Sequence, residues 1–418
     1  MNSKNKKRSP FLYGLWKFLA NVVSVVIFRR KYLRNEIKNK KGPMVIIANH
    51  QAALDFVNLI GATKAPMSFV ISNSFYHTIP LKGIMSRLGL IPKQQFQTTL
   101  SSLRKMKHAL DAGEILVIYP AGLMSDDGRS TPLPVGTYCF LRWVKADVYM
   151  AKTIGTYFSM PKWRRGGMRA GRTFIDIYKL FDKEELKAMS EDELRRRTDE
   201  ALLFDAYEEQ ESYRVKYQRN DDIEGLENVL YICPSCKKEF TVRTRDKSTI
   251  YCESCGFEEK ADKYQMLHKT SDVGDEIRHP SKWNAMIHDL VKEQIESGEL
   301  STLSSRVEIH MIPEGKSCFK KVGDGILTLT KDSFSLSGVP GAEEAELIIP
   351  ITSFAALPYK PGEYIEVQSG ETIYRCFTED GRLVIKFINM IKIFYEINTA
   401  EAERKKHARR NDWSIVIR

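Results

Sequence analysis

Four cysteines place the tightest constraint on what part of this chain can fold into. Cys233 and Cys236 form one C-x2-C pair, and Cys252 and Cys255 form a second pair after fifteen intervening residues. Two thiolate pairs at this spacing can surround one zinc ion in a tetrahedral site that leaves no open coordination position. Residues 231–260 are therefore predicted to be a zinc ribbon with a structural Zn cofactor. A redox role for either pair is the alternative.

Because zinc ribbons often bind nucleic acid, the charge of this segment helps to identify its partner. Residues 231–260 contain six Lys and Arg residues and five Asp and Glu residues, a net charge of +1. A nearly neutral ribbon binds a phosphate backbone poorly, and we expect no nucleic acid partner. The ribbon is expected either to hold larger domains in register or to dock a protein.

The basic charge of the chain is concentrated at its N-terminus. The 418 residues carry a net charge of +11, and residues 1–42 hold twelve Lys and Arg residues against one acid, Glu36. The rest of the chain therefore sums to zero. Three further cysteines, Cys139, Cys318 and Cys376, are scattered through apolar sequence, as expected for reduced thiols in the cytosol.

Residues 11–28 are an apolar stretch that lies between two basic clusters. Its small and polar positions recur every three or four residues, which places them on one face of a helix and leaves the opposite face apolar. These positions are Gly14, Lys17, Asn21 and Ser24. A spanning helix would carry Lys17 through hydrocarbon, so residues 1–42 are predicted to be a basic amphipathic arm in the membrane interface. The alternative is a helix packed on the protein's own core with a solvated basic edge.

Apolar runs and helical patterns alternate from about residue 43 to residue 182, which predicts an α/β architecture. Buried strands are expected at residues 43–48, 68–71 and 114–119, and an amphipathic helix at residues 100–112. Residues 183–230 are strongly charged and are predicted to be a helical connector, in which Ser190 and Glu193 are spaced as a capping box.

The pattern after the cysteine segment changes twice. Residues 261–306 are predicted to be a second helical connector. Residues 307–400 then alternate with period two over several short segments, which predicts a β-rich domain that ends in one helix over residues 382–398. This organisation resembles the pleckstrin-homology-like fold. Residues 401–418 are expected to be a basic tail.

A histidine and an aspartate follow the first buried strand, in Asn49-His50-Gln51-Ala52-Ala53-Leu54-Asp55. A histidine can hold and release a proton at cellular pH, and a carboxylate on its far nitrogen fixes the useful tautomer. His50 is therefore a candidate general base and Asp55 its orienting partner. The alternative is a histidine at a strand end that bonds only the backbone.

A second block begins after the strand at 115–118 and reads Tyr119-Pro120-Ala121-Gly122-Leu123-Met124-Ser125-Asp126-Asp127-Gly128. Together the two blocks resemble the glycerophospholipid acyltransferase family, which includes 1-acylglycerol-3-phosphate acyltransferases. The resemblance implies an acyltransferase domain over residues 43–182, with a mixed sheet flanked by helices. It further implies that His50 deprotonates the hydroxyl of a lysolipid acceptor, which attacks the thioester of acyl-CoA or an acylated carrier protein. Tyr119, Pro120 and Gly122 would line the substrate site.

The chain departs from the family pattern at three positions. Ala52 replaces a serine, and Ala121 and Met124 replace a glutamate and an arginine that in the family are associated with binding the acceptor's phosphate. Lys93 or Arg129 is a candidate replacement for that phosphate contact. The alternative for each is a solvated surface cation.

Three functions from different classes therefore remain open. The first is an active acyltransferase bound peripherally to the cytoplasmic face of the cell membrane. The second is a catalytically inactive relative that binds lipid or acyl carrier as a scaffold, a reading favoured by the three substitutions. The third is a nucleic-acid adaptor, which the nearly neutral ribbon disfavours.

Overall fold

The computed structural model describes residues 8–78, 85–93, 100–218, 222–313, 318–339, 346–354, 356–370 and 372–415. The chain divides into two units, Met1–Asn284 and Ala285–Arg418. The arm, the core, the charged connector and the cysteine segment all belong to the first unit. The boundaries proposed among them stay predictions.

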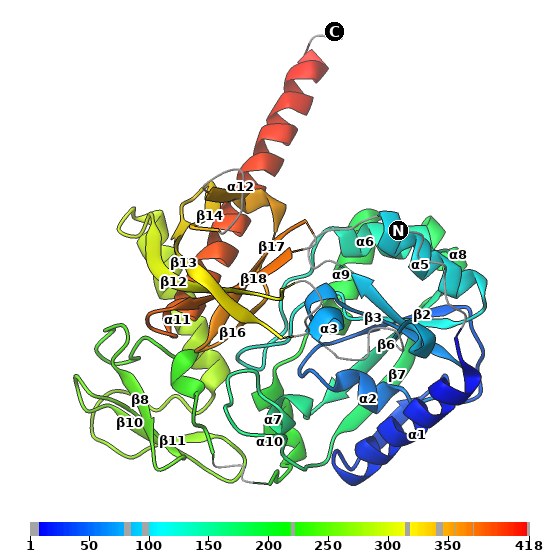
Figure 1. Cartoon of the computed structure of the whole chain (residues 1–418), viewed down its shortest axis with the longest axis horizontal. Helices are drawn as coiled ribbons and strands as arrows, with labels where there is room; N and C mark the ends of the chain where they lie inside the picture. The colour runs from blue at the N-terminus through cyan, green and yellow to red at the C-terminus, as the bar shows by residue number, and fades with distance from the viewer. Residues whose placement is uncertain are drawn as a thin grey trace. The chain divides into compact units, whose positions relative to one another are not determined.

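A seven-stranded sheet lies at the centre of the first unit, in the order β1-β7-β6-β2-β5-β3-β4 (Figure 1). Its strands are β1 Lys31–Asn35, β2 Met44–Ala48, β3 Met67–Ser72, β4 Leu90–Lys93, β5 Ile115–Ile118, β6 Asp147–Ile154 and β7 Phe174–Phe181. Every neighbouring pair is parallel except β6 and β7, which are antiparallel. The predicted mixed sheet is confirmed.

Helices cover both faces of this sheet, as expected for an α/β layer structure. The helices are α1 Pro10–Val26, α2 Asp55–Leu59, α3 Asn73–Thr78, α5 Leu100–Asp111, α6 Gly136–Val144, α7 Thr156–Ser159, α8 Lys183–Ala188, α9 Glu191–Leu202 and α10 Ala206–Tyr213. Successive residues of β2 point to opposite faces. Ile46 packs in a core with residues of α1 and α2, whereas Val45 and Ile47 pack with residues of α5, α6, α8 and α9.

The described residues of the N-terminal segment contact the rest of this unit. Strand β1 pairs with β7 in parallel, with Lys31 opposite Phe174. Helix α1 turns its polar face toward the domain: Lys17 Nζ donates to the carbonyl oxygen of Thr63 at 2.6 Å, and Ser24 Oγ donates to Asn58 Oδ1 at 2.8 Å. The apolar face of α1 therefore points outward. Among the described residues, none of the helices combines the length and the apolar character that crossing a bilayer requires.

The first part of the charged segment, up to Tyr213, forms the helices α8, α9 and α10. Ser190 caps α9 by accepting a hydrogen bond from the backbone N–H of Glu193. The cysteine segment forms a separate four-stranded antiparallel sheet in the order β11-β10-β9-β8. Its strands are β8 Val242–Arg245, β9 Thr249–Cys252, β10 Glu258–Ala261 and β11 Leu267–Lys269.

This small sheet extends beyond the predicted end of the ribbon. Residues 261–306, predicted to be a helical connector, include β11 and become helical only in α11, Pro280–Glu296. The strand was not evident from the sequence because β11 has three residues, and it is stabilised by pairing with β10 rather than by its own pattern.

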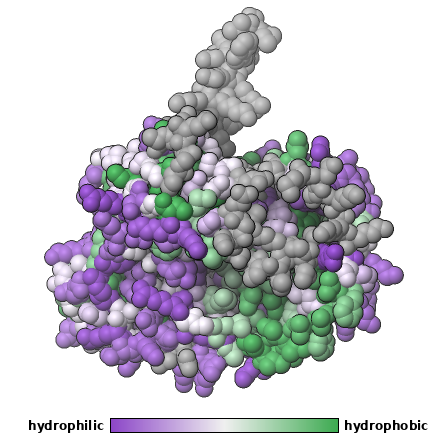
Figure 2. Space-filling model, in the orientation of Figure 1, coloured by the Kyte–Doolittle hydropathy of each residue, from purple (hydrophilic) through white to green (hydrophobic). Residues whose placement is uncertain are grey.

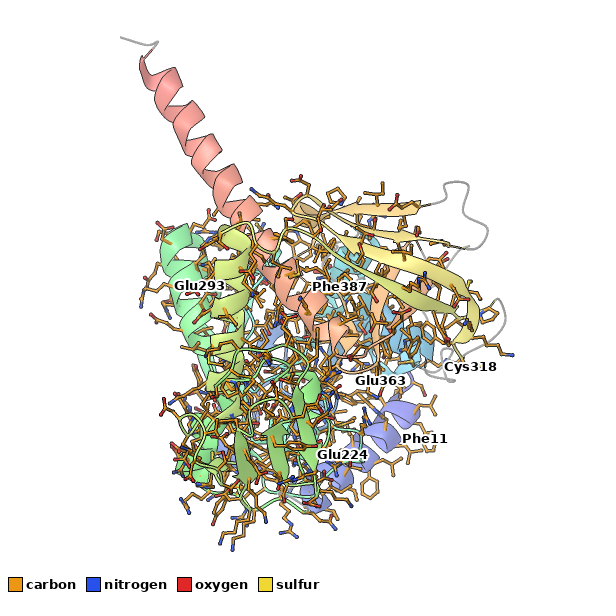
Figure 3. All side chains as sticks on the ribbon, turned by 90° about the vertical axis from the view of Figure 1, so that its left-hand side faces the viewer. Phe11, Glu224, Glu293, Cys318, Glu363 and Phe387 are labelled. Atoms are coloured by element: carbon orange, nitrogen blue, oxygen red, sulfur yellow. The ribbon has the colours of Figure 1, made fainter. Side chains whose placement is uncertain are left out.

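The second unit is β-rich, as predicted. Seven antiparallel strands lie in the order β15-β14-β13-β12-β18-β17-β16. They are β12 Leu303–Met311, β13 Lys320–Leu329, β14 Ser333–Ser337, β15 Glu346–Pro350, β16 Tyr359–Lys360, β17 Tyr364–Ser369 and β18 Thr372–Thr378. One helix, α12 Leu383–Ile415, packs its first turns against the sheet and then projects away from it (Figure 3).

The buried side of α12 is the side that the sequence pattern predicted. Val384, Phe387, Ile391 and Phe394 are all buried. Two four-stranded halves share the central strand β12, and one C-terminal helix packs on them. The β-rich C-terminal region expected from the sequence is confirmed, and its resemblance to the pleckstrin-homology-like fold stays a prediction.

Candidate functional site

His50 and Asp55 meet at the carboxyl end of β2. His50 Nδ1 lies 2.9 Å from Asp55 Oδ2, and the same oxygen accepts hydrogen bonds from the backbone N–H groups of Gln51 and Ala52 at 2.7 and 2.9 Å. Asp55 begins α2, so the short turn after β2 folds back and brings the carboxylate under the imidazole. The Asp55 side chain is fully buried, and that of His50 is 20% exposed. A buried carboxylate therefore orients a histidine that stays partly exposed to solvent.

The residues on either side of His50 hold it against the neighbouring strand, a role that was not evident from the sequence. Asn49 Nδ2 donates to the Thr153 carbonyl at 2.8 Å, and Asn49 Oδ1 accepts from the Thr153 N–H at 2.7 Å. Gln51 Oε1 accepts from the Thr156 hydroxyl and from the Tyr157 N–H. Asn49 and Gln51 are both buried, and a buried amide side chain needs hydrogen-bond partners. Two amide residues directly beside His50 were therefore the feature of the sequence that could have indicated this role.

Tyr119 stacks on the catalytic candidate. The centroids of the His50 and Tyr119 rings are 4.5 Å apart, and the ring planes are inclined by 30°. Burial, followed by the charge of Asp55, raises the pKa of Tyr119 well above its ordinary value. The buried Tyr119 hydroxyl has no hydrogen-bond partner in the part of the chain that the structure describes. The ring, and not the hydroxyl, is therefore what Tyr119 contributes to the position of His50.

Two matched substitutions test whether the ring or the hydroxyl of Tyr119 stabilises the fold. Tyr119→Phe keeps the ring and removes a buried hydroxyl without a partner, so we expect the free energy of unfolding to rise by about 1 kcal/mol. Tyr119→Ala also removes the stacking contact and leaves a cavity, and we expect a loss of about 3 kcal/mol. Denaturant unfolding of both variants measures the difference. Equal losses would mean that the hydroxyl makes a contact essential to the fold.

The rest of the second block forms a turn and a buried loop. The Gly122 N–H donates to the Tyr119 carbonyl at 3.0 Å, which closes a turn through Pro120, and Gly122 has a φ of 71°. Residues 123–130, here called the Ser125 loop, then pass beneath His50. The Ser125 N–H donates to the His50 carbonyl at 3.1 Å. Two blocks that are far apart in sequence are thus joined directly.

The two candidate phosphate ligands differ in their surroundings. Arg129 Nε donates to Asp127 Oδ2 at 2.8 Å, so an internal carboxylate already neutralises much of this guanidinium charge. Lys93 ends β4, on the edge of the sheet where β2 and β5 also end. Burial lowers its pKa, and among the described residues no carboxylate pairs with it. Lys93 is the better placed of the two cations to meet an anionic ligand.

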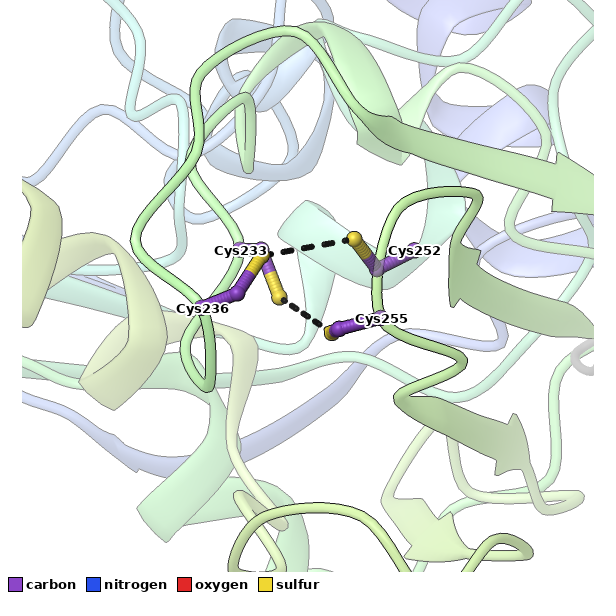
Figure 4. A group of neighbouring side chains, drawn as sticks. All are labelled: Cys233, Cys236, Cys252 and Cys255. Carbon is purple, nitrogen blue, oxygen red and sulfur yellow. Dashed lines mark hydrogen bonds between the residues drawn. The ribbon is translucent and has the colours of Figure 1, made fainter.

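The four cysteines converge on one point (Figure 4). Their sulfur atoms all lie within 4.8 Å of one another; Cys233 Sγ and Cys255 Sγ are 3.6 Å apart, and Cys236 Sγ and Cys252 Sγ are 3.8 Å apart. A tetrahedral zinc ion with Zn–S bonds of 2.3 Å requires sulfur separations of about 3.8 Å. The four thiols are therefore arranged as a set that could hold one metal ion.

The backbone supports this arrangement with two matching turns. The residue after each cysteine pair has a left-handed conformation, with φ of 60° at Lys237 and 77° at Gly256. The Lys237 N–H donates to the Cys233 carbonyl, and the Gly256 N–H donates to the Cys252 carbonyl, at 3.1 and 3.0 Å. Each turn therefore presents its two sulfur atoms toward the same centre, which fits a tetrahedral ligand set.

Comparison with known proteins gives a family for the part of the chain that holds His50. Residues 15–158 match the family model described as Acyltransferase. The 1-acyl-sn-glycerol-3-phosphate acyltransferase of Chlamydomonas reinhardtii is 24% identical over 174 residues, which cover 40% of this chain and 51% of that protein. The chain thus spans about half the length of this curated relative.

A solved structure also resembles the chain. The 1-acyl-sn-glycerophosphate acyltransferase PlsC from Thermotoga maritima matches with a TM-score of 0.40 and 20% sequence identity, covering 48% of this chain and 79% of that one. The family match covers the first six strands of the sheet in chain order, β1 to β6, with both sequence blocks. Residues 15–158, which match the Acyltransferase family model, include His50, Asp55 and the Ser125 loop, so the similarity to this family covers the part of the chain that holds the candidate site.

Proposed function

We propose that this protein is an O-acyltransferase that transfers a fatty acyl group from acyl-CoA or an acylated carrier protein to the hydroxyl of a lysophospholipid or related glycerolipid. The contact that carries the proposal is the one between His50 Nδ1 and the buried carboxylate of Asp55, at 2.9 Å. With its Nδ1–H directed at Asp55, a neutral imidazole presents an unprotonated Nε2, which is the form that a general base needs.

The chemistry follows from this tautomer. His50 Nε2 removes the proton of the acceptor hydroxyl as the oxygen attacks the thioester carbonyl, and Asp55 stabilises the imidazolium that forms. The tetrahedral intermediate then expels the thiolate, which takes the proton from His50. An ester bond forms, a thioester bond breaks, and no covalent acyl-enzyme is required. General-base assistance of this kind contributes about 10²- to 10⁴-fold to the rate.

The acceptor is proposed to carry a phosphate that Lys93 recognises. The name of the curated relative describes a 1-acyl-glycerol 3-phosphate acceptor. Ala121 and Met124 offer no charge to such a group, whereas Lys93 lies on the strand-end edge that also carries His50. Strands β2 and β4 are separated by three strand spacings, about 14 Å, so the long side chain of Lys93 and the phosphate headgroup together would have to bridge the distance to His50.

An acceptor panel tests the proposal directly. Labelled acyl-CoA and acylated carrier protein are offered with lysophospholipids that differ in headgroup, and with neutral monoacylglycerol. We expect labelled diacyl product with at least one lysophospholipid and faster turnover with phosphate-bearing acceptors than with the neutral one. No turnover with any pair would contradict the proposal and favour the second candidate, an inactive lipid-binding scaffold, for which the substitutions at Ala52, Ala121 and Met124 argue.

The four-cysteine group is proposed to hold one structural zinc ion. Cys233, Cys236, Cys252 and Cys255 would supply all four ligands, which leaves no position for substrate. The zinc would fix the fold of residues 231–269 and take no part in acyl transfer.

The protein is also proposed to work at a membrane surface, on which its lipid substrates reside. The outward face of α1 carries seven exposed apolar side chains: Phe11, Leu15, Phe18, Leu19, Val22, Val25 and Val26. Phe11 is 77% exposed and points away from the domain in Figure 3, and the apolar patch to which it belongs lies at the lower right of Figure 2. An apolar helix face beside basic residues inserts into the headgroup region of anionic bilayers.

Two substitutions on this face test the membrane contact. Deleting residues 1–42 would also remove β1 from the sheet, so we choose the double variant Phe11→Ser and Phe18→Ser. Both side chains are more than half exposed, and the fold should tolerate the change. We expect vesicle binding to weaken at least 100-fold, because each buried phenylalanine contributes about 1.5 to 3 kcal/mol.

Flotation with vesicles that contain anionic phospholipid measures the loss. Leu203→Ser is the matched control, because Leu203 is 65% exposed and lies outside α1. Unchanged flotation of the double variant would show that another surface makes the contact.

A further inference from the structure

We infer that Asn284 is a positioning residue, through which the four-cysteine module (residues 231–269) holds the Ser125 loop and thereby the backbone of His50. The inference rests on the proposed function for its kinetic consequence but not for its structural one. Asn284 lies 126 residues beyond the end of the family match, so nothing in the acyltransferase motif points to it.

The first link joins the module to the start of α11. Trp283 is fully buried, and its Nε1–H donates to the carbonyl of Ile232 at 2.8 Å. Its ring meets Phe257 edge to face, with the centroids 5.5 Å apart. Ile232 directly precedes Cys233, and Phe257 follows Cys255 by two residues. The two cysteine turns therefore build the pocket that holds the indole.

The second link joins α11 to the Ser125 loop. Asn284, the residue after Trp283, donates from Nδ2 to Asp127 Oδ2 at 2.9 Å. Burial by itself would raise the pKa of Asp127, but the charge of Arg129, followed by the hydrogen bonds from Asn284 and Arg129, lowers it below its usual value. The carboxylate is therefore ionised, and a buried anion needs donors of this kind to remain in place.

The third link joins Asp127 to His50. Asp127 Oδ1 accepts from the Arg129 N–H at 2.9 Å, and Ser125 Oγ donates to the Arg129 carbonyl at 2.7 Å and accepts from the Gly128 N–H at 2.9 Å. These bonds make the loop one hydrogen-bonded unit. The Ser125 N–H then donates to the His50 carbonyl. A shift of Asp127 is thus passed to the residue proposed as the base.

Asn284 lies outside the Ser125 loop and contacts it through one hydrogen bond. Two substitutions distinguish the effect of this hydrogen bond from the effect of the side chain's shape. Asn284→Ala removes the donor. Asn284→Asp keeps the shape but replaces the donor with a carboxylate that faces the ionised Asp127. We expect both to loosen the loop, and the isosteric Asp variant to be at least as damaging as the Ala variant. Lys282→Ala is the control, because Lys282 is exposed on the same turn of α11.

Amide hydrogen exchange of peptides that cover residues 123–130 measures how readily the backbone of the Ser125 loop opens in the full-length, zinc-loaded chain. We expect exchange there to be at least tenfold faster in both Asn284 variants and unchanged in Lys282→Ala, with zinc content equal to wild type. Removing zinc by chelation should accelerate exchange in the same peptides. Under the proposed function, kcat falls about tenfold, because small displacements of a catalytic group are costly, while the KM for the acyl donor is unchanged.

Unaltered exchange in both variants, or wild-type exchange in Asn284→Asp alone, would overturn the inference. The exchange measurement does not depend on activity. A chain that turns over no acceptor, yet shows faster exchange in both Asn284 variants, would refute the proposed function and leave the positioning role in place.

Discussion

His50→Ala is expected to lower the rate of acyl transfer by about three orders of magnitude, within the range that general-base assistance supplies. The loss should appear in kcat, because the base acts in the transition state and makes no large contribution to holding the acyl donor. The acceptor panel provides the assay. The side chain is 20% exposed, and Asp55 keeps two backbone donors when the imidazole is gone, so the fold should survive.

The controls for this variant separate chemistry from folding. His108→Ala changes an exposed histidine on α5 and should leave turnover unchanged. Asp55→Asn keeps the shape of the side chain but allows the imidazole to adopt the wrong tautomer, and we expect a loss close to that of His50→Ala. Thermal unfolding and zinc content should match wild type in His50→Ala. Equal turnover in His50→Ala and wild type would eliminate the proposed mechanism.

Cys252→Ser is expected to abolish zinc binding and to unfold the four-cysteine module. Binding of structural zinc contributes about 10 to 16 kcal/mol to the folding of zinc-finger peptides. Without zinc, the module would be stabilised by a sheet of only four short strands. We expect one zinc per wild-type chain by elemental analysis and almost none in the variant. We also expect a new unfolding transition at lower temperature, which chelation of the wild-type protein reproduces.

The matched control is Cys139→Ser, which removes an exposed cysteine outside the group. It should keep both the zinc and the melting temperature. A Cys252→Ser protein that retains a full equivalent of zinc and melts as wild type would show that the four thiols are not the ligand set.

The parts of the fold that the sequence predicted are those with strong local patterns. The apolar run that became β2 was found with its end at Ala48, and the C-terminal region was predicted to be β-rich from its period of two, without its number of strands. The convergence of His50 and Asp55, and of the four cysteines, was also predictable, because each set lies within one short motif or one known ligand spacing.

The parts that were not predicted depend on partners distant in sequence. Strand β1 has the sequence Lys-Tyr-Leu-Arg-Asn, which shows no apolar alternation; its pairing with β7 makes it a strand. The hydrogen bond from Asn284 to Asp127 joins residues 157 positions apart, and no spacing rule relates them. The polar face of α1 was recognised, but residues 1–42 were predicted to be an arm in the membrane interface, and packing against the protein's own core was only the alternative. The structure shows that this face packs inward, while the apolar face is exposed.

The pairing of β1 with β7 has a consequence for synthesis of the chain. Lys31 lies opposite Phe174, so the ribosome adds 143 residues between the first strand and its neighbour. At about 5 to 20 residues per second this takes roughly 7 to 30 seconds. During that interval the apolar face of α1 has left the exit tunnel, and β1 has not yet paired with β7. A chaperone or a lipid surface that covers this helix face during synthesis would protect the nascent chain before its own active site has formed.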